Sequence, residues 1–368
     1  MEGDLIKINE WLIPLSWLYS LGVRVRNLLF DIGVLKSESF PIPIINVGNI
    51  TVGGTGKTPH VEYLIRLLSP KYKVAVLSRG YKRKSSGYRL ATEETRMEEI
   101  GDEPWQMKHK FPHVHVAVDG NRRRGIRRLM SDPESRDVEV IILDDAYQHR
   151  YVHPGMNILL VDYHRMITDD RMLPAGRLRE GVSAKARANM VIVSKCPYDI
   201  SPIGFRVIQS ALRLKPFQKL FFSTLKYGEL HQLCSDKAMP LSALRTMHVL
   251  MLSAIGSPLQ MEQDLRRMAR HVTSLAFRDH HFFSAEDCKT ISAALDALPQ
   301  PSVIVTTEKD ATRLLHLDGL DEATRERIYV LPIEVNVIRD GAHALNTKIL
   351  SYVQSDKRDF GMAREKDA

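Results

Sequence analysis

The stretch NVGNITVGGTGKTPHVEYLI, Asn46 to Ile65, decides the fold of this chain. Three glycines at positions 53, 54 and 56 come directly before Lys57 and Thr58. Glycine reaches backbone conformations that are closed to other residues, so consecutive N–H groups there can turn inward around an anion. Lys57 adds a positive charge for β- and γ-phosphates, and the Thr58 hydroxyl can bind Mg²⁺. The stretch therefore predicts a phosphate-binding loop.

The flanking sequence supports this prediction. The apolar run IPIINV predicts a strand before the loop, and KTPHVEYLIRLLS predicts a helix after it, with its N-terminus toward the same anion. The strict pattern G-x-x-x-x-G-K-[ST] requires glycine where this chain has Thr51, but the residues nearest the phosphates are still glycine-rich. The predicted nucleotide-binding residues are Thr51, Val52, Gly53, Gly54, Thr55, Gly56, Lys57 and Thr58.

A second acidic element lies in EVIILDDAYQHR. Its apolar residues predict a strand that delivers Asp144 and Asp145 to the edge of the sheet, where a carboxylate can hold Mg²⁺ directly or through water. The alternative is a pair of solvated turn residues. Together with the loop, the pair predicts a metal site at Thr58, Asp144 and Asp145, and the sequence leaves open which aspartate contacts the metal.

Short apolar runs recur along the first part of the chain, at 41–49, 73–81, 113–121, 139–148, 157–165 and 189–197. They are continuously apolar rather than alternating, which is typical of parallel strands covered on both faces. We expect an α/β fold of the P-loop NTPase type, with a mostly parallel sheet and helices on both faces. Ligands of such sheets bind beyond the carboxyl ends of the strands.

The pattern changes near residues 221–230, and a second set of strand-like runs follows. We expect a nucleotide-binding domain over 36–222 and a smaller α/β domain over 223–350 that closes over the cleft. The charged residues 351–368 show no periodicity and predict a frayed or disordered tail.

Residues 1–35 predict an amphipathic helix. The apolar stretch Trp11–Val23 has 13 residues and contains Pro14, whereas a membrane span needs about 20 apolar residues. From Trp17 onward the apolar residues share one side at helical spacing, and polar residues gather on another. Two interpretations stay open: a helix packed on its own domain, and a helix lying in a membrane interface.

Composition sets wider limits. The 368 residues suit two domains, and the formal net charge of +8 permits anionic partners without choosing among them. The three cysteines, Cys196, Cys234 and Cys288, are far apart, which argues against a disulfide framework or a zinc site.

Seven motifs occur in the order found in one family: VGNITVGGTGKTP, LSRGYKR, GDEPWQM, DDAYQHR, MLPAGRLRE, DHHFF and TTEKDATRL. The chain thereby resembles the tetraacyldisaccharide 4′-kinases, the lipid A kinases of Gram-negative bacteria, over about residues 40–315 and in its N-terminal apolar helix. The resemblance implies transfer of the γ-phosphate of ATP, with Mg²⁺, to the 4′-hydroxyl of a tetraacyldisaccharide 1-phosphate, giving lipid IVA. It also implies attachment to the cytoplasmic face of the inner membrane, which favours the interfacial helix.

Further site residues follow from the resemblance. An aspartate and a histidine of the family are thought to activate the sugar hydroxyl, and by motif these are Asp102 and His280, although His281 is adjacent. Catalytic roles are thus expected for Asp102, His280, Lys57 and Asp145. Glu180 is expected in the Mg²⁺ shell, and Arg177 or Arg179 near phosphate charge.

Two other classes remain as alternatives. A P-loop ATPase of the partitioning type would act as a binding module, but it carries an extra lysine where this chain has Val52. A nucleic-acid-binding protein would use the basic runs RGYKRKSSGYR and NRRRGIRR, but no aromatic stacking motif accompanies them. We expect a monomer that binds a lipid disaccharide and a membrane surface, and no nucleic acid.

Overall fold

The computed structural model describes residues 8–366, apart from Asp236, Ser257, Asp279, His280, Phe282, His316 and Asp318, with side chains described as far as Asp356. The chain divides into two compact units. Unit 1 comprises the chain up to Leu225 and from Val335 onward, and unit 2 comprises Lys226–Glu334.

Unit 1 is built on a nine-stranded sheet in the order β15-β8-β7-β6-β1-β5-β2-β4-β3. The strands are β1 (Ile44–Gly48), β2 (Val74–Ser78), β3 (Arg89–Leu90), β4 (His115–Val118), β5 (Val140–Asp144), β6 (Met156–Asp162), β7 (Met190–Ser194), β8 (Lys219–Tyr227) and β15 (Ile333–Val337). The pairs from β4 across to β8 are parallel, and only β3 joins β4 antiparallel among the pairs whose register is given. The six apolar runs of the first domain are confirmed as strands, and the expected mostly parallel sheet is confirmed.

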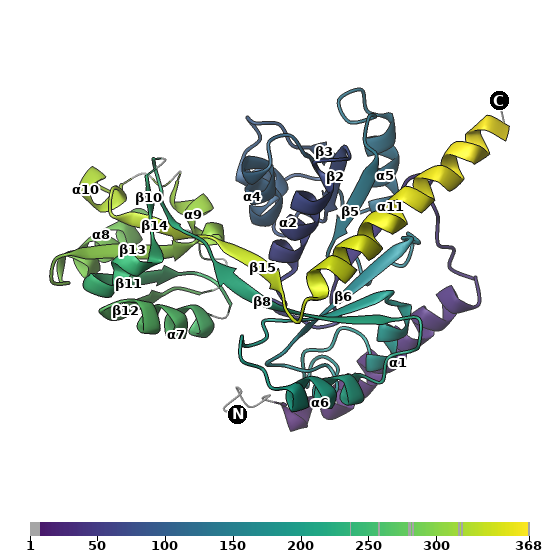
Figure 1. Cartoon of the computed structure of the whole chain (residues 1–368), viewed down its shortest axis with the longest axis horizontal. Helices are drawn as coiled ribbons and strands as arrows, with labels where there is room; N and C mark the ends of the chain where they lie inside the picture. The colour runs from purple at the N-terminus through teal and green to yellow at the C-terminus, as the bar shows by residue number, and fades with distance from the viewer. Residues whose placement is uncertain are drawn as a thin grey trace. The chain divides into compact units, whose positions relative to one another are not determined.

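Helices cover both faces of this sheet (Figure 1). They are α2 (Lys57–Leu68), α3 (Met97–Ile100), α4 (Asp102–Lys110), α5 (Arg122–Ser131), α6 (Pro202–Leu212) and α11 (Gly341–Lys366), with the 3₁₀ turn η2 (Val182–Arg187). The unit also contains the 3₁₀ turn η1 (Glu10–Leu12) and helix α1 (Ile13–Asp31), which lie outside these layers. Successive strand residues point to opposite faces. Ile45 and Val47 pack with α2, α4 and α11, whereas Ile44 packs with α5.

Unit 2 is a smaller α/β unit with a six-stranded sheet in the order β10-β9-β14-β13-β11-β12. Its strands are β9 (Leu230–Gln232), β10 (Ala238–Met239), β11 (His248–Ser253), β12 (His271–Ala276), β13 (Ser302–Thr307) and β14 (Ile328–Leu331). Its helices are α7 (Leu259–Met268), α8 (Ala285–Asp296), α9 (Glu308–Leu314) and α10 (Glu322–Arg325), with the 3₁₀ turn η3 (Leu241–Thr246).

The C-terminal region differs from the sequence prediction. Residues 335–350 were expected in the smaller domain, but they belong to unit 1, because β15 joins its sheet and α11 packs on its core. The predicted frayed tail is wrong for residues 351–366, where α11 continues as a helix. Leu345, Ile349 and Val353 recur at helical spacing and are buried, and this short apolar stripe is followed by charged residues that hide the pattern.

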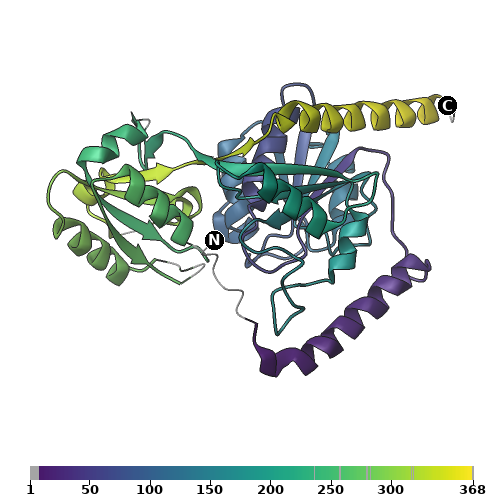
Figure 2. The ribbon, with the colours of Figure 1, turned by 60° about the horizontal axis from the view of Figure 1, so that its bottom comes forward.

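Helix α1 lies at the edge of unit 1 (Figure 2). Among the helices of the described residues, none is long and apolar enough to cross a membrane.

Candidate functional site

The loop between β1 and α2 has the backbone that its glycines predict. Gly53 and Gly56 adopt φ angles of +115° and +79°, in the left-handed region that favours glycine. Gly48, at the end of β1, is required for another reason: a Cβ there would lie 2.8 Å from Cβ of Tyr147. Helix α2 begins at Lys57, so its free N–H groups lie at the end of the loop.

Neighbouring segments hold this loop in place. The buried Asn49 amide donates to the hydroxyls of Thr51 at 3.3 Å and Thr55 at 2.9 Å. The backbone of Val52 donates to the carbonyl of Arg177 at 2.7 Å. Thr51 forms a β-bridge with Leu178. An extended bridge suits a β-branched residue, which accounts for threonine at the position where the strict pattern has glycine.

Lys57 and Asp145 meet at the carboxyl edge of the sheet. The Lys57 ammonium lies 3.7 Å from Oδ1 of Asp145, and Arg179 Nη1 lies 3.3 Å from its Oδ2. Asp145 has a φ of +49°, which is uncommon for a residue with a side chain and which aspartate tolerates better than most. The structure therefore brings together the loop lysine and one of the two predicted acidic residues.

Asp144 occupies a more buried position beside them. Its side chain is 6% exposed, and Ser78 at the end of β2 donates to its Oδ2 at 3.0 Å. Burial raises the pKa of the Asp144 carboxyl to about 6, and the negative charge of Asp145 adds to this, while the Lys57 charge opposes it. The positive charge of Lys57 only partly offsets the two adjacent negative charges, so a cation bound beside them would be stabilised.

Asp102 stands at the first position of α4 in unit 1 and is buried. Its loop packs tightly against the loop after β2, because a Cβ on Gly101 would lie 2.9 Å from the carbonyl of Tyr81. The next residue, Glu103, is near enough to contribute to the raised pKa of Asp144. Asp102 therefore directly precedes a residue whose charge acts on the Asp144 carboxyl.

The predicted partner of Asp102, His280, lies outside the described residues. The neighbouring His281 in unit 2 has a structural environment. Its Nε2 lies 2.9 Å from Oδ2 of Asp287, and its ring stacks on Phe277 with centroids 4.8 Å apart.

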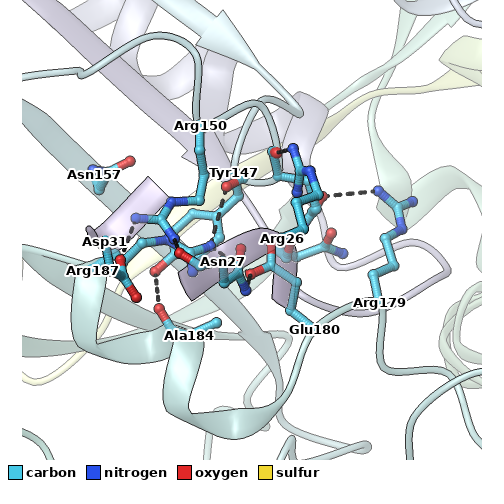
Figure 3. A network of polar contacts seen from close by, with 12 residues as sticks. Arg26, Asn27, Asp31, Tyr147, Arg150, Asn157, Arg179, Glu180, Ala184 and Arg187 are labelled. Carbon is cyan, nitrogen blue, oxygen red and sulfur yellow. Dashed lines mark hydrogen bonds and ion pairs between the residues drawn. The ribbon is translucent and has the colours of Figure 1, made fainter. Parts of the chain in front are cut away.

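Glu180 lies in a polar network between α1 and the loops after β5 and β6 (Figure 3). Its Oε2 accepts from Arg187 at 2.8 Å and from Asn27 at 3.2 Å. Its Oε1 is buried and has no hydrogen-bond partner within the described part of the chain. An orphaned carboxylate oxygen is the state expected where a cation or a water completes the site.

Helix α1 turns polar side chains toward the rest of unit 1. Ser16 donates to the carbonyl of Met172 at 3.0 Å, Tyr19 to that of Arg179 at 3.1 Å, and Arg26 to that of Gln148 at 2.8 Å. Most apolar residues of the predicted stripe are exposed, among them Trp17 at 71% and Leu18 at 69%. This orientation is the reverse of that of a helix packed by its apolar side.

Sequence reasoning missed a group of basic residues at the same edge. Arg122 is 2% exposed, and its two terminal nitrogens donate to the carbonyls of Asp119 and Asp144. Burial lowers the pKa of His149 to about 4, and the charges of Arg122, Arg123, Arg26 and Arg79 lower it further. The run NRRRGIRR suggested an exposed basic surface, and nothing in the sequence indicated that Arg122 is buried.

Several known proteins are similar to this chain over nearly its whole length. A family model described as tetraacyldisaccharide-1-P 4′-kinase matches residues 8–354. The tetraacyldisaccharide 4′-kinase of Phocaeicola vulgatus is 53% identical over 362 residues, covering 98% of this chain and 99% of the relative. That of Bacteroides thetaiotaomicron is 48% identical over 378 residues, covering 100% and 99%.

A solved structure matches as well. The crystal structure described as an "apo" form of LpxK from Aquifex aeolicus in complex with ATP superposes with a TM-score of 0.72 and 30% identity, covering 94% of this chain and 99% of that chain.

A parallel sheet whose carboxyl edge carries a glycine-rich loop, a lysine at the end of that loop and paired carboxylates defines a P-loop nucleotide-binding protein. The comparisons narrow the class. The chain belongs to the tetraacyldisaccharide 4′-kinase family. It is therefore an enzyme of lipid A biosynthesis, a kinase that phosphorylates the 4′-position of a tetraacyldisaccharide 1-phosphate, and the alternative of a partitioning-type ATPase is not favoured.

Proposed function

We propose that the phosphates of ATP bind in the loop Thr51–Thr58 and that the γ-phosphate passes to the 4′-hydroxyl of the lipid acceptor, giving lipid IVA. One observation carries the proposal: Lys57 reaches to 3.7 Å from Asp145 at the mouth of a glycine-rich loop that leads into a helix N-terminus. The relative of known structure from Aquifex aeolicus is described as being in complex with ATP, which supports the choice of nucleotide.

Mg²⁺ fits the side chains at this edge. The available ligands are the Thr58 hydroxyl and the carboxylates of Asp144 and Asp145, all hard oxygen donors of the kind that Mg²⁺ prefers. Ser78 uses only Oδ2 of Asp144, and the unpartnered Oε1 of Glu180 offers a further oxygen. When bound, the ion supplies positive charge to the β- and γ-phosphate oxygens. No group of three acidic, histidine or cysteine ligands occurs within the described residues, which is compatible with an ion that substrate phosphates and water help to hold.

The chain's own residues then have distinct roles. Lys57 neutralises charge on the transferring phosphoryl group, and Arg179, which pairs with Asp145, orients that carboxylate. Asp102 and His280 are proposed to take the proton of the acceptor hydroxyl, because a sugar hydroxyl is a weak nucleophile that a positioned base activates. Arg79, whose charge acts on the buried Arg122 and on His149, is proposed to give anionic groups of the acceptor, such as its 1-phosphate, a counter-charge.

Helix α1 is proposed to lie in the interface of the inner membrane, on its cytoplasmic face. Its polar side chains are bonded to unit 1, whereas Trp17, Leu18 and Leu21 are 71%, 69% and 59% exposed. An exposed apolar helix side with aromatic residues is typical of interfacial helices. An acceptor with four acyl chains resides in the bilayer, so a kinase held at that surface meets it there.

The experiment is a transfer assay with γ-labelled ATP and purified tetraacyldisaccharide 1-phosphate in mixed micelles. We expect the wild type to label the lipid and Lys57→Ala to lose this activity, while Lys71→Ala, which changes an exposed lysine beyond α2, retains it. Near-normal labelling by Lys57→Ala would refute the role of the loop. ATP hydrolysis without lipid labelling would retain the loop and refute the acceptor.

A further inference from the structure

Three successive carbonyl groups of the phosphate loop each accept a hydrogen bond from a dedicated side chain. Lys195 donates to the carbonyl of Gly54. Ser194 donates to that of Thr55 at 2.9 Å. His60 Nδ1 lies 2.7 Å from that of Gly56.

These three bonds fix the orientation of the N–H groups. A trans peptide is planar, and its C=O and N–H point in opposite directions. When the carbonyls of residues 54, 55 and 56 are held on one side, the N–H groups of Thr55, Gly56 and Lys57 face the other. None of these three N–H groups donates a hydrogen bond to another part of the chain within the described structure. They form the inward-facing row that an anion requires.

His60 is suited to hold its bond permanently. It is 4% exposed, and its Nε2 lies 3.0 Å from the hydroxyl of Ser223, in the middle of β8. Burial lowers the pKa of His60 to about 4, so the ring is neutral near pH 7. A neutral ring has one donor and one acceptor nitrogen. With Ser223 donating to Nε2, Nδ1 carries the proton and donates to Gly56.

The other two donors come from the end of β7. Ser194 is fully buried, and its hydroxyl also lies 3.2 Å from the carbonyl of Val161, farther than from Thr55. Lys195 has a φ of +59°, a conformation uncommon for lysine. It aims its ammonium between the loop and Asp162, whose Oδ2 is 2.7 Å away. The backbone of Lys195 thus adopts an unfavourable left-handed conformation, and in that conformation its side chain reaches the carbonyl of Gly54.

We propose that His60, Ser194 and Lys195 are positioning residues that hold the phosphate loop in its anion-binding conformation before the nucleotide arrives, an inference that rests on the proposed binding of ATP at this loop. The loop is then pre-organised, and little ordering entropy is lost on binding. None of the three needs to touch the phosphates. Their action passes through the backbone of residues 54–57.

Removing one side-chain donor loosens one peptide plane, and least so at Gly56, whose carbonyl also accepts from the backbone N–H of His60 at 3.3 Å. A net hydrogen bond corresponds to roughly a fivefold to tenfold change in an equilibrium constant, and a charged one to more. We expect Ser194→Ala to raise the dissociation constant for ATP about fivefold to tenfold, and Lys195→Met about tenfold or more. His60→Leu is expected to act similarly, whereas His60→Asn keeps an amide donor near the Nδ1 position and recovers most of the affinity.

The experiment measures binding of ATP and of inorganic tripolyphosphate by calorimetry, together with KM for ATP, KM for lipid and kcat. Tripolyphosphate has no base, so it reports the loop alone. The expected result is weaker binding of both ligands and a raised KM for ATP, with KM for lipid unchanged. The matched control is Ser135→Ala, which removes another buried serine hydroxyl that donates to a backbone carbonyl at 2.9 Å, away from the loop. It is expected to bind both ligands as the wild type does.

Three outcomes would overturn the inference. Equal tripolyphosphate affinity in wild type and Lys195→Met, with weaker ATP binding, would assign Lys195 to the base instead. An equal loss in Ser135→Ala would indicate general destabilisation. Unchanged affinity in all three loop variants would refute the positioning role. Failure of the wild type itself to bind either ligand would instead refute the proposed function. Lys195→Met is the fallback if buried variants do not fold, since its side chain is 21% exposed.

Discussion

Asp144 is expected to lower the stability of the protein when no metal is bound. Its pKa of about 6 in the fold lies above the ordinary 3.8, because burial and the adjacent Asp145 disfavour its charged form. The folded state therefore holds this proton more tightly than the unfolded chain, and stability falls as pH rises from about 4 to about 6. The shift of about two units corresponds to roughly 3 kcal/mol at pH about 7.5, and to about half of that at pH about 5.

Asp144→Asn removes this cost, and its amide oxygen can still accept from Ser78. We expect the metal-free variant to melt roughly 4–6 °C above the wild type near pH 7.5, with the difference shrinking as the pH is lowered toward 4. The same variant is expected to lose most of its kinase activity and its stabilisation by Mg²⁺-ATP. Stability would thus rise as function is lost, which is typical of residues retained for chemistry.

The assay is differential scanning calorimetry in EDTA at several pH values, with Asp145→Asn as the matched control. Asp145 is 29% exposed and pairs with Lys57 and Arg179, so neutralising it removes two ion pairs and is expected to give no gain. The reasoning is refuted if Asp144→Asn gains nothing near pH 7.5, or if its gain is the same at pH 4.

Three further outcomes are expected. Asp102→Asn and His280→Ala are each expected to lower kcat more than they lower the affinity for ATP. Because both residues act on one proton, the loss of kcat in the double variant is expected to be much smaller than the product of the two single losses. A double-variant loss equal to that product in single-turnover kinetics would contradict the dyad. Leu18→Glu combined with Leu21→Glu weakens liposome co-sedimentation by roughly 100-fold or more, since each leucine loses about 1.5–3 kcal/mol of apolar burial; Ile203→Glu, at an exposed site 73% accessible on α6, is the control, and equal loss there would contradict a membrane contact specific to α1. Arg79→Gln raises KM for the lipid and leaves KM for ATP unchanged; the reverse split in steady-state kinetics would place Arg79 at the nucleotide.

The sequence was sufficient for the sheet and for the loop. Continuous apolar runs mark parallel strands covered on both faces, and β1, β2 and β5 lie within the predicted runs. The glycines, Lys57 and the aspartate pair could be assigned to one edge because parallel strands end together. These predictions needed only local pattern and the rule for where ligands bind.

Tertiary contacts determined the rest. The proposed role of His60 and Ser194 depends on the loop carbonyls that their side chains contact. Ser194 contacts a segment far from it in the sequence, and no local sequence pattern predicts either contact. The amphipathic character of α1 was predicted, but which side faces unit 1 depends on polar partners more than 100 residues away, such as Met172 and Gln148. The length of α11 was missed because its buried stripe is brief and its end is charged.

Arg179 links α1 directly to the phosphate loop. Its carbonyl accepts from Tyr19 of the helix at 3.1 Å, and its N–H donates to the carbonyl of Ile50 at 2.7 Å. If α1 lies in the membrane interface as proposed, Arg179 connects the membrane-bound helix to the strand end that carries the nucleotide loop. The proposal then implies a set distance between the bilayer surface and the transferred phosphoryl group, and acceptors whose sugar hydroxyl stands at that distance would be preferred.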